Sequence, residues 1–186
     1  MKLAITGVVV GLVVSGFSVS SAFAAAPYVS GSAGVAMPGD SGLTARSYDT
    51  GYNLAGAAGI DGGRYRLEVE LGHQNNKVHG TGASESMTTY MGNGYIDLEL
   101  PFSPLKPFVI AGVGFSNVHE DDGFGRTAGD MVFAWQFGGG AGFSVAPWTT
   151  LDAQYRYFAT SSAELAGNHG NSISTHKVML GLRLSF

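Results

Sequence analysis

Charged side chains are scarce in this sequence, and nine of them recur at alternate positions within apolar segments. They are Arg66, Glu68, Glu70, Asp97, Glu99, Asp152, Arg156, Lys177 and Arg183. Their signs are mixed, and a buried charge is costly unless an opposite charge or hydrogen bonds compensate it. This spacing therefore predicts mutual ion pairing inside the protein. We expect Arg66 to pair with Glu99 and Asp152 to pair with Arg183, and Lys177 to act as a further counter-charge to the acidic residues.

Two histidine–serine pairs bear on catalysis. His176 follows Ser174, and His169 precedes Ser172, so each pair offers part of a hydrolase site. A catalytic triad is defined by geometry rather than by composition. Neither pair matches a lipid A deacylase or palmitoyltransferase motif, and we predict no catalytic residue and no enzyme activity.

Two further motifs bear on metals and cofactors. Segment 119–123 (HEDDG) offers the oxygen ligands that calcium prefers, but it lacks the spacing of an EF-hand. Segment 138–142 (GGGAG) lies within a strand-like stretch and is not followed by a helix, unlike a dinucleotide-binding loop. We interpret the first as a solvated loop and the second as a close-packed strand, and predict no metal and no cofactor.

The composition narrows the protein class. The 186 residues suffice for one domain, and the absence of cysteine excludes disulfides and thiolate metal sites. Glycine contributes 29 residues, charged residues are 13%, and apolar residues are 45%, which favours tightly packed β structure over disorder. The net charge of −4 and the lack of a basic patch argue against a nucleic-acid partner.

Residues 1–24 have the pattern of a secretory signal peptide. Lys2 precedes an apolar run over residues 3–17, and Ala22 and Ala24 form an A-x-A cleavage site. The run is shorter than the roughly 20 residues that span a bilayer as a helix. We therefore expect a cleaved leader, 1–24, and one mature domain, 25–186.

Strict alternation is clearest in the C-terminal segment 177–186. Its apolar face comprises Val178, Leu180, Leu182, Leu184 and Phe186, whereas Lys177 and Arg183 share the opposite face. Such a period of two indicates a β-strand. Seven more segments follow the pattern, some weakly: 28–37, 52–60, 65–73, 88–100, 108–116, 132–145 and 150–159. Their lengths suit tilted membrane strands of about 9–11 residues.

The connections between these segments alternate in length. Segments 61–63, 101–106 and 146–148 are short, whereas 38–51, 74–87, 118–131 and 160–175 are longer and polar. Short turns on one side and long loops on the other are typical of an outer-membrane barrel. We predict an all-β fold, an eight-stranded antiparallel up-and-down transmembrane β-barrel, with both termini in the periplasm of a Gram-negative bacterium.

The charged face must point inward in such a barrel. An arginine or lysine that faces lipid at the bilayer centre costs roughly 2–4 kcal/mol. Aromatic residues are expected in two interfacial girdles. One comprises Tyr28, Tyr65, Phe102, Phe108, Trp148 and Phe186, and the other Tyr52, Tyr90, Phe115, Phe133, Trp135 and Tyr157. A soluble lipocalin-like barrel would reverse the polarity of the two faces, but the export signal, loop asymmetry and aromatic C-terminus favour the membrane form.

Several stretches resemble a known family. Segments 106–116 (KPFVIAGVGFS), 151–158 (LDAQYRYF), 93–98 (NGYIDL) and the last strand resemble the small outer-membrane barrels of the OmpA/OmpX and opacity-type surface antigen group, often labelled "porin family". The resemblance implies that the last strand is the signal for the barrel-assembly machinery. The residues that match this signal are Val178, Leu180, Leu182, Leu184 and Phe186.

Three functional hypotheses follow. The first is a monomeric structural or surface-interaction barrel in outer-membrane lipid, with a lumen plugged by side chains, because eight strands leave an interior about wide enough to be filled. Its four long loops would meet a host or cell-surface ligand. The second is a narrow channel for ions or small solutes. The third, less favoured, is a lipid-modifying enzyme of the outer leaflet.

Overall fold

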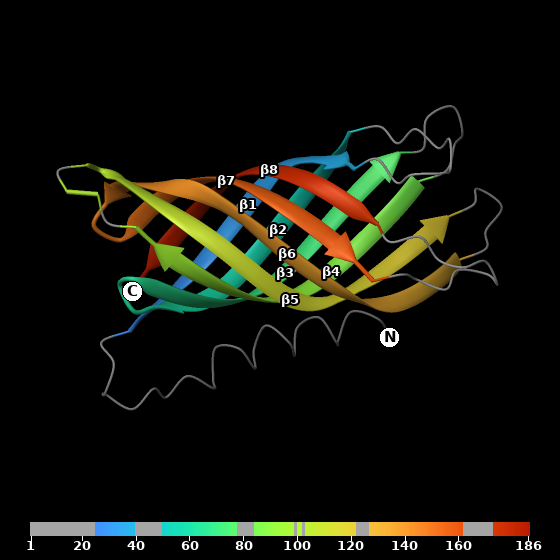
Figure 1. The fold of residues 1–186 in the computed structure, drawn as a ribbon, viewed down its shortest axis with the longest axis horizontal. Helices are drawn as coiled ribbons and strands as arrows, with labels where there is room; N and C mark the ends of the chain where they lie inside the picture. Colours follow the sequence, from blue (N-terminus) through green and yellow to red (C-terminus); the bar gives the residue numbers. More distant parts are fainter. Residues whose placement is uncertain are drawn as a thin grey trace.

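The described residues of the computed structural model form a closed antiparallel barrel of eight strands (Figure 1). The structure describes residues 25–39, 50–77, 84–98, 100–101, 103–121, 127–161 and 173–186. The strands are β1 (Ala26–Pro38), β2 (Gly51–Asp61), β3 (Tyr65–Lys77), β4 (Ser84–Asp97), β5 (Leu105–Asp121), β6 (Thr127–Ala146), β7 (Thr149–Thr160) and β8 (Ser174–Ser185). Each strand pairs with its sequence neighbours, and β8 closes on β1. The predicted all-β, eight-stranded barrel is confirmed.

Two hairpins extend further than the sequence pattern indicates. β5 and β6 have 17 and 20 residues, and their ladder continues to the pair Asp121 and Thr127. β3 and β4 likewise stay paired to Lys77 and Ser84. The expected loops 118–131 and 74–87 are therefore too long at both ends. Backbone hydrogen bonds sustain a ladder even where side chains no longer alternate between apolar and polar.

The pairing register is offset around the barrel. Hydrogen-bonded neighbours can be followed from Tyr28 through one residue of every other strand, and this path returns to β1 at Pro38, ten residues further along. Such a stagger requires the strands to tilt against the barrel axis, as Figure 1 shows. The C-terminus lies at the end that holds the short turns.

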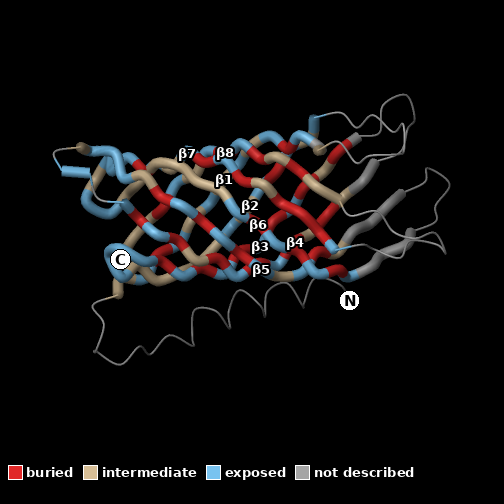
Figure 2. Tube along the Cα trace, viewed as in Figure 1, coloured by how far each residue is buried: buried red, intermediate tan, exposed pale blue. Residues whose placement is uncertain are grey.

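Burial alternates along the strands (Figure 2). On the outer face, Leu67, Val69 and Leu180 are 62%, 49% and 70% exposed, whereas Arg66 and Arg156, which face the lumen, are each 2% exposed. Apolar side chains outside and charged side chains inside are the arrangement of a membrane barrel and the reverse of a lipocalin. The lipocalin-like alternative is therefore wrong.

Two aromatic residues lie inside the lumen instead of at a membrane interface. Tyr28 and Phe108 are 1% and 3% exposed, and the Phe108 ring packs edge-on against Tyr95 at 5.7 Å between centroids. Both have the lumen-facing parity of their strands, and they were assigned to a girdle only because each stands close to a strand end. Most other members of the two expected girdles lie on the outer face, and Phe102 falls outside the described residues.

The turn between β2 and β3 depends on glycine. Gly63 has φ of 87°, a conformation that residues with a Cβ atom rarely adopt. Its N–H donates a hydrogen bond of 2.8 Å to Oδ1 of Asp61. The turn thereby holds Asp61 at the rim of the lumen.

Candidate functional site

The described lumen contains three groups of ion pairs, and the first closes the end with the short turns. Nε and Nη2 of Arg66 donate to the two carboxylate oxygens of Asp97 at 2.6 and 2.8 Å. The guanidinium lies 4.2 Å from the ring centroid of Tyr95 and 5.0 Å from that of Phe108. Asp97 is therefore a partner of Arg66 that we did not expect, and Glu99, the expected partner, lies outside the described residues.

The second ion pair spans the lumen from β7 to β3. Nη1 of Arg156 donates to Oε2 of Glu70 at 2.5 Å. The same guanidinium donates to the hydroxyl oxygen of Tyr95 at 3.1 Å and to Gln154 at 3.2 Å. Because one residue contacts groups on three strands, it fixes the opposite walls of the barrel relative to each other.

The third group lies near the rim. Arg183 donates to both carboxylate oxygens of Asp152 at 3.3 and 3.4 Å, the partner expected from the sequence. It also donates to Asp61 at 3.4 Å. Asp61 was not predicted because it was assigned to a turn, where alternation does not show which face a side chain occupies. Its position directly before two glycines, at the end of a strand, was the available signal.

The charge of Glu68 is compensated by hydrogen bonds from neutral groups. Its carboxylate accepts hydrogen bonds from the hydroxyls of Tyr28 and Tyr95 at 3.1 and 2.8 Å, and from Asn93 and Ser30 at 3.2 and 3.4 Å. Among the described residues, no cationic group lies within ion-pairing distance of it. Tyr95 accepts from Arg156 while donating to Glu68, so it links this carboxylate to the second ion pair.

Within the described part of the chain, Lys177 forms no ion pair with a carboxylate. It is 4% exposed, and none of the carboxylates in the described part of the chain lies within ion-pairing distance of its ammonium group. Its Nζ lies 4.1 Å from the ring centroid of Phe158. Each acidic residue in the described lumen instead pairs with an arginine or accepts hydrogen bonds from neutral donors.

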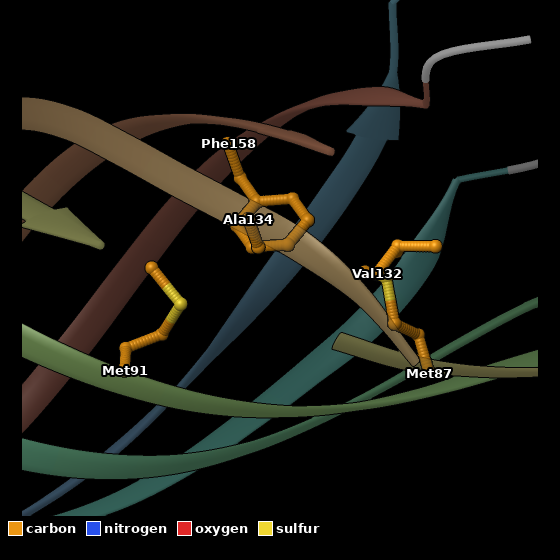
Figure 3. Close-up of a cluster of buried hydrophobic side chains, with 5 residues drawn as sticks. All are labelled: Met87, Met91, Val132, Ala134 and Phe158. Carbon is orange, nitrogen blue, oxygen red and sulfur yellow. The ribbon is translucent and has the colours of Figure 1, made fainter. Parts of the chain in front are cut away.

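Beyond Lys177, the lumen holds an apolar cluster beside buried polar residues such as Gln74, Asn76 and Thr175. Met87, Met91, Val132, Ala134 and Phe158 form a buried cluster from β4, β6 and β7 (Figure 3). The partly buried Ile173 packs against it. This cluster was not predicted, because only the charged residues were assigned to the lumen. The signal was present, since Phe158 shares parity with Arg156 and Met91 shares parity with Asn93.

The polar part of the lumen holds a small cavity of about 20 Å³. Ser30, Ser32, Glu70, Gln154 and Arg183 are among the residues that line it. A volume of roughly 10–15 Å³ is needed for one water molecule. The cavity therefore accommodates about one water molecule and is too small for passage of a solute.

The other predicted sites lie apart from the lumen. Four residues of the expected assembly signal, Val178, Leu180, Leu182 and Phe186, are exposed on the outer face, and Leu184 is half-buried there. Ala22 and Ala24 lie outside the described residues.

The histidine–serine candidates do not form a described triad. His176 shares a hydrogen bond of 2.6 Å with the hydroxyl of Tyr155 on the outer face. His169 and Ser172 lie outside the described residues. Within the described part of the chain, no three His, Asp or Glu side chains are grouped as metal ligands.

Comparison with known proteins places the fold. Residues 9–186 match the family model of the outer membrane protein beta-barrel domain. Over 92 residues, the chain is 35% identical to outer membrane protein PagN of Salmonella typhimurium, a match that covers 45% of this chain and 38% of PagN. The match thus spans well under two thirds of PagN.

Two solved structures share the architecture. Neisserial surface protein A superimposes with a TM-score of 0.68 at 20% identity, over 86% of this chain and 97% of that protein. The attachment invasion locus protein Ail of Yersinia pestis, in complex with the heparin analogue sucrose octasulfate, gives a TM-score of 0.52 at 13% identity, over 87% and 99% of the two chains. At these identities the likeness is one of fold.

Proposed function

Because this chain belongs to the outer membrane protein beta-barrel domain family, we propose that it is a closed surface barrel whose long connections meet ligands outside the cell. The chain is an outer-membrane β-barrel protein of a Gram-negative bacterium. Its strands sit in the bilayer and its four longer connections share one end of the barrel. In our proposal this end is extracellular, the termini are periplasmic, and the leader 1–24 is removed.

The observation that carries the proposal is the filled lumen. Arg156 and Glu70 tie opposite walls together, and the apolar cluster around Phe158 occupies the space beyond them. A conducting path would have to break buried ion pairs and hydrate apolar side chains, both of which are costly. The arrangement therefore favours a surface role over the narrow channel that we keep as an alternative.

The charge of the connections favours a basic ligand. Segments 38–51, 74–87, 118–131 and 160–175, which comprise the connections and the strand ends that border them, together contain eight acidic and three basic residues. Opposite charges steer association and suppress partners of like charge. Ail was crystallised with a sulfated heparin analogue, and the acidic connections of this chain argue against the same kind of ligand here.

Assembly completes the proposal. The apolar outer face of β8, ending at Phe186, would be recognised by the barrel-assembly machinery, and the finished barrel would remain a monomer. The exposed positions of Val178, Leu180 and Phe186 support recognition of this face.

Retention on charged surfaces tests the surface role. The refolded barrel is passed over immobilised polylysine and immobilised heparin, beside a variant in which residues 40–49, 78–83, 122–126 and 162–172 are replaced by short Gly-Ser linkers. We expect retention on polylysine that falls with added salt and is weaker in the variant, which lacks four of the eight acidic residues. Stronger retention on heparin, or unchanged retention of the variant, would contradict the proposal.

A further inference from the structure

The lipid-facing side of the barrel carries a hollow of about 800 Å³ that spans β8, β1, β2 and β3 and reaches Leu151 on β7 and Thr88 on β4. Gly31 and Gly56 form its floor and are paired directly across β1 and β2. Leu182 is paired with Gly31 on one side, and Leu71 with Gly56 on the other. The hollow is thus two strands wide and bounded by leucine ridges.

The fold itself does not require glycine at these two positions. Neither has a positive φ, and a Cβ atom at either would meet no other atom within 4 Å. By contrast, a Cβ atom at Gly114 or Gly138 would collide with a backbone carbonyl of the neighbouring strand. Glycine weakens a strand because it has no side chain to pack, and often marks a place where another molecule approaches closely.

The lining of the hollow changes from apolar to polar along its length. Leu54, Leu71 and Leu182 surround the floor, whereas His73 and Thr88 lie at the end nearer the long connections. The ring of Tyr52 lies 6.4 Å from that of His73 at the same end. Tyrosine and histidine at this level suit the boundary between acyl chains and headgroups, where aromatic belts of membrane proteins lie.

We propose that the hollow binds one acyl chain of an outer-membrane lipid, with the headgroup of that lipid beside His73 and Thr88. The order of apolar floor and polar end matches the order of chain and headgroup in a lipid. A second barrel fits less well, because two barrels are convex towards each other and would touch at the leucine ridges. A flexible chain can follow the floor between them.

Photolabelling tests the proposal on the intact barrel. The protein is reconstituted in phosphatidylethanolamine vesicles that contain a small fraction of the same lipid with a diazirine in mid-chain. On illumination, the diazirine loses N₂ and the resulting carbene inserts into a nearby C–H bond. We expect labels at Leu54, Leu71 and Leu182 at least fivefold above those at Val69 and Val113, which lie on the outer face of β3 and β5.

A competition experiment identifies which lipid supplies the acyl chain. Unlabelled phosphatidylethanolamine and purified lipid A are added in turn, and the lipid that lowers the signal at the hollow at the lower concentration is the preferred ligand. Even labelling around the barrel, unaffected by either competitor, would overturn the proposal. So would a photoproduct that joins two copies of the chain through the hollow.

Filling the hollow provides a second test. Gly31→Leu with Gly56→Leu should reduce labelling of Leu71 and Leu182 to the level of the rest of the barrel. Gly92→Leu is the matched control, because Gly92 also faces outward and its Cβ atom would meet only ordinary contacts. Gly56→Val alone serves if the double variant does not fold. Full labelling in a folded, filled variant would contradict the site.

Discussion

The hydroxyl of Tyr28 on β1 donates a hydrogen bond of 3.1 Å to Glu68 on β3, across the strand that separates them. The residue beneath this bond is Gly59 of β2, and a Cβ atom there would lie 2.6 Å from Cζ of Tyr28. The bond therefore exists only because β2 has no side chain at that point. It joins two strands that are not neighbours and adds to the stiffness of the barrel wall.

Substitution of Gly59 should disrupt this crossing. Gly59→Val places a branched side chain where the phenol lies, and its Cβ atom would also lie 2.5 Å from the carbonyl oxygen of Leu67. Overpacking of this kind typically costs about 1–3 kcal/mol. Urea unfolding of the refolded barrel in detergent micelles measures the change. Gly31→Ala is the control, because its methyl group points into open space. Equal stability of the two variants would show that Tyr28 and the backbone of β3 both move aside freely.

Lys177 and Arg156 should respond in opposite ways to the same substitution. Lys177→Met removes a buried charge that has no carboxylate partner among the described residues, and replacement of buried charges by apolar groups can stabilise a protein by roughly 1–4 kcal/mol. The lost contact with Phe158 offsets part of this gain, so we expect an increase of about 1 kcal/mol in the free energy of unfolding.

Arg156→Met leaves Glu70 buried without its partner and should cost about 3–5 kcal/mol. The same urea titration measures both variants. A loss of stability in Lys177→Met as large as that in Arg156→Met would mean that the ammonium group has a stabilising role beyond its contact with Phe158.

The apolar cluster should contribute stability without being the sole barrier in the lumen. Phe158→Ala removes a fully buried ring and should cost about 3–5 kcal/mol. In planar bilayers we expect neither the wild type nor this variant to show discrete openings, because the pair Arg156–Glu70 still crosses the lumen. Stable openings of the wild-type protein would instead support the narrow channel.

Deletion of Phe186 should impair assembly. The residue ends the apolar outer face of β8 and is 76% exposed, so its loss removes little internal packing. We expect a several-fold fall in the amount of heat-modifiable barrel in outer-membrane fractions, with unassembled chain in the periplasm. Phe137→Ala is the control, since Phe137 is also an outward-facing ring but lies within β6. Equal levels of both variants would argue against a terminal recognition signal.

The sequence predicted the barrel because its two faces differ so sharply in polarity. Alternation of Val178, Leu180 and Leu182 with charged or small residues defines the parity of β8 without reference to any other strand. The pair Asp152–Arg183 followed from the same parity on adjacent strands. Alternation does not, however, show how far along the barrel axis each side chain lies.

The position of each side chain along the barrel axis determines the contacts that were not predicted. Arg66 pairs with Asp97, and Lys177 meets Phe158, because side chains in a tilted barrel reach along the axis as well as across it. Tyr28 and Phe108 were placed at an interface from their positions near strand ends, yet both face inward. Only the register of the complete barrel determines these contacts.

The ten-residue offset that closes the barrel has a consequence for how such a chain can diverge. A single residue inserted into a strand would turn its remaining side chains to the opposite face and break the closure on both neighbours. An insertion in a long connection changes neither. The strand lengths are therefore constrained as one set, whereas each connection can change alone, so recognition can evolve while the membrane span is conserved.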